Sequence, residues 1–104
     1  MDAIDLSPEN FKKKLADGAQ PIDVRTPQEF IRGHIKKAWL IDFYEHSFSQ
    51  RIRALNKKKE YAVYCLHGNR SGHAVAMMQQ IGLKTFHLKG GIEAWEREGF
   101  EIEP

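Results

Sequence analysis

Hydrophobic residues in this chain follow two alternating spacings, one typical of β-strands and one typical of helices. Short runs rich in apolar and β-branched residues are each followed by a more polar segment whose apolar residues lie three or four positions apart. The predicted strands are 3–6, 21–25, 38–42, 60–65 and 85–88. The predicted helices begin at Ser7 and Thr26, span 48–55 and 71–81, and centre on Ala94 and Trp95. This alternation predicts an α/β fold with a mainly parallel five-stranded sheet and helices on both faces.

Several helix boundaries carry their own chemical signals. Ser7 precedes a proline and an acidic residue, and Thr26-Pro27-Gln28-Glu29 has the form of a capping box with proline at the first helical position. Asp17-Gly18 and Gly82 end two of the helices. The run 60–65 is rich in strand-forming residues and is expected to be the central strand.

Composition limits the function further. The 104 residues fit one compact domain, 1–104, and their 41% hydrophobic content allows a real core. A net charge of +2 is too balanced to indicate a nucleic acid partner or an anionic membrane surface. No apolar run is long enough to span a bilayer, and the first residues do not resemble a signal peptide. With one cysteine and hence no intrachain disulfide, a reducing, cytoplasmic setting is expected.

The cysteine lies at the end of the predicted central strand and just before a predicted helix. In parallel α/β sheets, ligands bind beyond the carboxyl ends of the strands, so this position is the candidate site. The loop residues are Cys65, Leu66, His67, Gly68, Asn69, Arg70 and Ser71.

These residue types favour an ionised sulfur with an anion beside it. The following helix dipole, the N–H groups of residues 66–70, and the cations Arg70 and His67 all stabilise a thiolate. Gly68 allows the unusual backbone angles that such a loop needs. Ser71 can either cap the helix or donate its hydroxyl to the site.

The loop resembles the active-site loop of the rhodanese family of sulfurtransferases, in which a cysteine and four residues precede a basic residue and a serine or threonine. Residues 23–35 are similar to the family block D-V-R-x-x-x-E-[FY]-x-x-G-H-I, and residues 90–95 to the block G-G-x-x-x-W. The three blocks follow the family's order. One departure is Lys36-Lys37-Ala38-Trp39, which stands where the family usually has P-G-A.

The resemblance implies a rhodanese-like fold and a sulfurtransferase that carries sulfur as a persulfide on Cys65. Loop amides, Arg70 and His67 would bind a small anionic sulfur donor such as thiosulfate, and a thiol, cyanide or a protein would accept the sulfur. No metal or organic cofactor is implied. The resemblance also implies a supporting polar network formed by Asp23, Arg25, Glu29 and His34.

Two other function classes stay open at this point. A cysteine-dependent phosphatase or arsenate reductase would also place cysteine and arginine around an anion, but such loops have five intervening residues, and here residues 66–69 make four. A non-enzymatic module could use the same fold to bind a partner protein, although the retained cysteine favours an enzyme. The sequence leaves the physiological donor and acceptor, the pathway and the oligomeric state undetermined.

Overall fold

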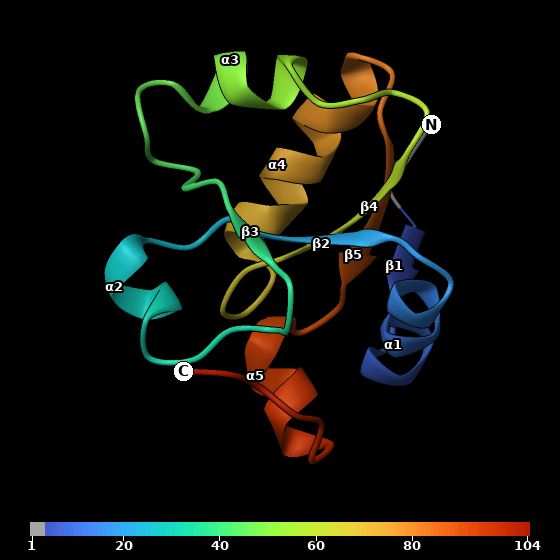
Figure 1. The fold of residues 1–104 in the computed structure, drawn as a ribbon, viewed down its shortest axis with the longest axis vertical. Coiled ribbons are helices and arrows are strands. Elements are labelled where there is room, and N and C mark those ends of the chain that lie inside the picture. The colour runs from blue at the N-terminus through green and yellow to red at the C-terminus, as the bar shows by residue number, and fades with distance from the viewer. Residues whose placement is uncertain (1–3) are drawn as a thin grey trace.

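The computed structural model describes residues 4–104, and it confirms the predicted α/β architecture with a mainly parallel sheet (Figure 1). The five strands are all parallel, in the spatial order β1-β5-β4-β2-β3. They are β1 (Ile4–Leu6), β2 (Gln20–Asp23), β3 (Trp39–Leu40), β4 (Glu60–Tyr64) and β5 (Lys84–Leu88). Residue 3, which the sequence places in the first strand, lies outside the described residues.

The helices cover both faces of the sheet. They are α1 (Pro8–Ala16), α2 (Pro27–Phe30), α3 (Phe48–Arg53), α4 (Asn69–Gln80) and α5 (Gly91–Arg97). Figure 1 shows α3 and α4 on one face and α1 and α5 on the other. Each face has its own apolar cluster: Phe48 and Met78 belong to the first, and Phe11 and Trp95 to the second.

The predicted starts of the first two helices are confirmed. Ser7 accepts a hydrogen bond from Asn10 N at 3.2 Å and caps α1. Thr26 and Glu29 form a reciprocal capping box at the start of α2, in which each side chain bonds the other residue's backbone N–H. Both helices have proline at the start, where its missing N–H breaks no helical bond.

β4 is the central strand of the sheet, as predicted. Tyr61 and Val63 point into the cluster under α3 and α4, whereas Ala62 and Tyr64 point into the cluster under α1 and α5. All four are fully buried, which is the pattern of a strand covered on both faces. Because β2 and β5 flank β4, the loops that follow these three strands meet at one edge of the sheet.

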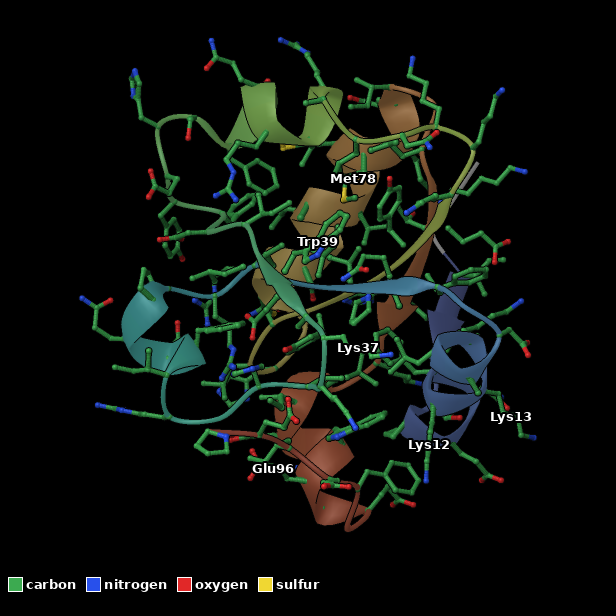
Figure 2. The ribbon with its side chains drawn as sticks, in the orientation of Figure 1. Lys12, Lys13, Lys37, Trp39, Met78 and Glu96 are labelled. Carbon is green, nitrogen blue, oxygen red and sulfur yellow. The ribbon has the colours of Figure 1, made fainter. Side chains whose placement is uncertain are left out.

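Several boundaries differ from the prediction by one or two residues, and β2 and α3 each end two residues earlier than predicted, at Asp23 and Arg53. The third strand has only two residues, because β3 lies at the sheet's edge and pairs with β2 alone. Its Trp39, labelled in Figure 2, is 43% exposed. The fourth helix begins at Asn69 instead of Ser71.

Among residues 4–104, no helix combines the length and the apolar character needed to cross a membrane.

The segment before β3 contains an unusual backbone conformation. Lys37, labelled in Figure 2, has φ = 69°. This value is left-handed, and residues other than glycine adopt it at some energetic cost. It occupies the position at which the P-G-A pattern has glycine. Gln20 Nε2 donates to the carbonyl of Lys37 at 2.8 Å and so helps to fix this turn.

Candidate functional site

Cys65 follows the last residue of β4, at the carboxyl edge of the sheet where the sequence predicts the site. The residue is only 1% exposed, and one side of it belongs to the apolar cluster under α4. The loop above it is more open, since His67 and Asn69 are exposed and Leu66 is half-buried.

The sulfur of Cys65 is surrounded by hydrogen-bond donors. Gly68 N donates to Sγ at 3.1 Å and Ser71 N at 3.3 Å, and the hydroxyl of Ser71 lies 3.2 Å from Sγ. The sequence predicted amides from residues 66–70, but the second amide belongs to Ser71, just beyond that range. Hydrogen bonds to the ionised form of a group favour that form. The three donors therefore stabilise negative charge on the sulfur, whereas its burial acts in the opposite direction.

Gly68 produces this arrangement through its backbone. Its φ of 115° confirms the predicted unusual angle, and it ends the loop at the N-cap of α4. Because the cap is Gly68, Ser71 is not needed as the helix cap, and its hydroxyl faces the sulfur instead. The partial positive charge at the start of this 12-residue helix adds to the stabilisation of a thiolate.

Gly91, the second glycine after β5, lies directly against the cysteine loop. Ile92 N donates to the carbonyl of Cys65 at 2.9 Å, and Glu93 N donates to that of Leu66 at 3.2 Å. A Cβ at Gly91 would overlap Leu66 O and lie 2.7 Å from Cys65 O. The G-G-x-x-x-W block therefore brings the start of α5 into direct contact with the cysteine peptide.

Arg70 does not stand free at the site. Its two terminal nitrogens bind the two oxygens of Glu29 at 2.7 and 2.9 Å. Hydrogen bonding from Arg70 lowers the pKa of Glu29 to about 2, and hydrogen bonding to Glu29 raises the pKa of Arg70. The pair is ionised but close to neutral overall, so Arg70 attracts an anion less strongly than an unpaired cation would.

His67 also has an acidic partner, which sequence analysis missed. Its Nδ1 lies 2.9 Å from Glu93 Oε1, and both side chains are about half exposed. The signal for Glu93 was its place in the G-G-x-x-x-W block, two residues after the glycine that touches the loop. Within residues 4–104, no three His, Cys, Asp or Glu side chains gather as metal ligands would.

The four residues expected to support the site lie around the loops after β2. Asp23 and Arg25 form a buried ion pair at 2.7 Å, and Arg25 also donates to Gly33 O at 2.7 Å. His34 stacks on Phe30, with 3.9 Å between ring centroids. These contacts connect the block 23–35 internally, and Glu29 connects it to the cysteine loop through Arg70. Of the four, Glu29 thus contacts the cysteine loop directly, whereas Asp23, Arg25 and His34 make these contacts within the block 23–35. The functional roles of all four stay predictions.

Two further residues reach the sulfur through Ser71, and sequence analysis did not identify either. His87 Nε2 lies 2.7 Å from Ser71 Oγ, and His87 Nδ1 lies 2.7 Å from Asp5 Oδ1. His87 is 8% exposed and comes from β5, whereas Asp5 comes from β1. The signal in the sequence was His87 itself, a polar residue inside the predicted strand 85–88.

Comparisons with known proteins agree with this arrangement. The model of the rhodanese-like domain matches residues 7–98. Thiosulfate sulfurtransferase GlpE of Pseudomonas aeruginosa is 37% identical, over 86% of this chain and 81% of its own. A sulfurtransferase of Allochromatium vinosum is 33% identical, over 94% of this chain and 92% of its own. The crystal structure of a rhodanese-related protein from Thermoplasma volcanium, 31% identical, superposes with a TM-score of 0.88 over 96% of this chain and 97% of that one. The chain therefore belongs to the rhodanese-like domain family.

Proposed function

We propose that this protein is a thiosulfate or persulfide sulfurtransferase that carries sulfur on Cys65. The observation that carries the proposal is the set of donors around Sγ: the amides of Gly68 and Ser71 and the Ser71 hydroxyl, all within 3.3 Å. These donors favour a thiolate, which is the nucleophilic form of cysteine. The names of the sulfurtransferase relatives in Pseudomonas and Allochromatium support the same reaction class.

The reaction has two covalent steps. The Cys65 thiolate attacks the outer sulfur of thiosulfate, the S–S bond of the donor breaks, and its electron pair leaves with sulfite. A persulfide then stays on Cys65 until a thiolate or cyanide attacks its terminal sulfur and returns Cys65 as a thiolate. Each step transfers one neutral sulfur atom between two nucleophiles, so no external oxidant or reductant is needed.

The same loop gives each step its stabilisation. Gly68 and Ser71 donate to negative charge on the cysteine sulfur before the first step and after the second. Preorganised main-chain donors in a site with little water stabilise charge more than solvent does. The short spacing between Cys65 and Arg70 leaves a tight space that suits one sulfur atom better than a tetrahedral phosphate.

Steady-state kinetics with thiosulfate and cyanide test the proposal. The account expects ping-pong kinetics, loss of activity in Cys65→Ser, and a fall of about 10–100-fold in kcat for Ser71→Ala. Ser49→Ala in α3 is the matched control and should behave as the wild type. Hydrolysis of an aryl phosphate well above the Cys65→Ser background, without sulfur transfer, would favour a phosphatase and contradict the proposal.

A further inference from the structure

A continuous chain of hydrogen bonds runs from the buried sulfur to the protein surface. Cys65 Sγ lies 3.2 Å from Ser71 Oγ, which lies 2.7 Å from His87 Nε2. His87 Nδ1 in turn lies 2.7 Å from Asp5 Oδ1. The side chain of His87 is 11% exposed and that of Asp5 is 62% exposed, so the chain ends at solvent.

The chemistry of the end groups fixes the direction of these bonds. An ionised carboxylate can only accept, so Nδ1–H of His87 donates to Asp5 and Nε2 is free to bond the hydroxyl of Ser71. When His87 is neutral, Nε2 accepts from Ser71 O–H, and Ser71 Oγ accepts the S–H of Cys65. When His87 is protonated, Nε2–H donates to Ser71 Oγ, and Ser71 O–H donates to a Cys65 thiolate.

Both arrangements satisfy every hydrogen bond, and they differ by the transfer of one proton along the chain. We propose that the Ser71–His87–Asp5 chain takes the proton of Cys65 and so generates the thiolate for sulfur transfer. The S–H proton passes to Ser71 Oγ while the hydroxyl proton of Ser71 passes to His87 Nε2. Asp5 keeps its charge and stabilises the resulting imidazolium.

Within residues 4–104, Asp5 is the one charged group that contacts the ring of His87 from the neighbouring elements. Asp5 on β1 is the acid that contacts it. Arg70, at the start of α4, is already paired with a carboxylate. Lys14 of α1 lies over the ring of Phe86, which points to the opposite face of β5.

The backbone holds the histidine in place. In the sheet, His87 pairs in register with Asp5 on one side and with Val63 on the other. Gly68 lies over the ring, since a Cβ at that position would come within 3.7 Å of His87 Cε1. His87 acts on the sulfur only through Ser71, so it is a positioning residue, and the inference rests on the proposed use of Cys65 as the nucleophile.

The test is the pH dependence of Cys65 alkylation by iodoacetamide, which reports thiolate without any sulfur donor. The glutamine in His87→Gln keeps hydrogen-bonding groups, but its amide cannot take up a proton at neutral or alkaline pH. We expect its alkylation rate to fall about tenfold at neutral pH and to approach the wild-type rate at alkaline pH, where hydroxide removes the proton. Asp5→Asn, on an exposed side chain, should show a smaller fall in the same direction, and His46→Gln in an exposed loop should show none. A wild-type pH profile in His87→Gln would overturn the inference.

A second measurement keeps the test open if His87→Gln does not fold. The ¹⁵N chemical shifts of the His87 ring are followed against pH in the wild type and in Cys65→Ser. Coupled groups share their titration, so removing the ionisable sulfur should move the His87 midpoint. An identical midpoint in the two proteins would contradict the proton chain. Either result is independent of sulfur transfer, so this inference and the proposed function can fail separately.

Discussion

Replacing Gly91 by alanine tests how closely the last helix supports the cysteine loop. Gly91 has φ = 67°, where an alanine costs about 1–2 kcal/mol in backbone strain. Its new Cβ would also overlap Leu66 O, which must then move. That movement weakens the bonds from Ile92 N to Cys65 O at 2.9 Å and from Glu93 N to Leu66 O at 3.2 Å, each worth about 1 kcal/mol. The expected loss in the free energy of unfolding is about 3–4 kcal/mol.

Gly99→Ala separates the two contributions. Gly99 has a similar φ of 79°, but an added Cβ there meets nothing within 4 Å. Its expected loss is the backbone strain alone, about 1–2 kcal/mol. Urea unfolding followed by tryptophan fluorescence measures both variants, and the slope with denaturant should be unchanged in each.

The clash should also reach the reactive sulfur. Because the Cys65–Leu66 peptide has to shift in Gly91→Ala, the distances from Sγ to Gly68 N and Ser71 N change as well. We expect slower alkylation of Cys65 in Gly91→Ala and a wild-type rate in Gly99→Ala. Equal losses of stability in the two variants, with equal alkylation rates, would refute the reasoning about close contact.

Two further predictions concern the neighbouring blocks. Lys37→Gly removes the strain of a side chain on a left-handed backbone and should raise the free energy of unfolding by about 0.5–1 kcal/mol. The control Lys36→Gly should lower the free energy of unfolding. A loss of stability in both variants would show that Lys37 is not strained. The ion pair of Glu29 with Arg70 should make stability depend on pH. The folded pKa of Glu29, about 2, lies below its ordinary value of 4.5, so the pair stabilises above pH 4.5 and this stabilisation disappears as pH falls toward 2. After allowance for solvent screening, the ion pair stabilises the fold by about 1–2 kcal/mol. Urea unfolding at a series of pH values should show that Glu29→Gln loses less stability in acid than the wild type does. Equal acid sensitivity in the two proteins would contradict this prediction.

Much of the site could be predicted because its strongest signals are local in sequence. The strand that ends just before Cys65, the glycine with a positive φ and the start of a helix all lie within a few residues. The capping box of Thr26 and Glu29 is local as well, and it is present in the structure. Such features depend on neighbouring backbone and side-chain chemistry, which the sequence displays directly.

The parts of the site that could not be predicted depend on contacts between residues that are far apart in the sequence. Asp5 and His87 are 82 positions apart and meet only because β1 and β5 are neighbours in the sheet. The pairing of Arg70 with Glu29 spans 41 positions and changes Arg70 from a free cation into one half of an ion pair. Hydrophobic periodicity predicts strands but not their spatial order, so it could not place these partners together.

The most direct test of the account is the intact mass of the protein after incubation with thiosulfate and removal of excess reagent. The account predicts an added mass of one sulfur atom, located on the peptide that contains Cys65 and lost again on treatment with cyanide. Cys65→Ser should gain nothing under the same conditions. A wild-type protein that gains no sulfur from thiosulfate or from a low-molecular-weight persulfide, while remaining folded, would contradict the central claim.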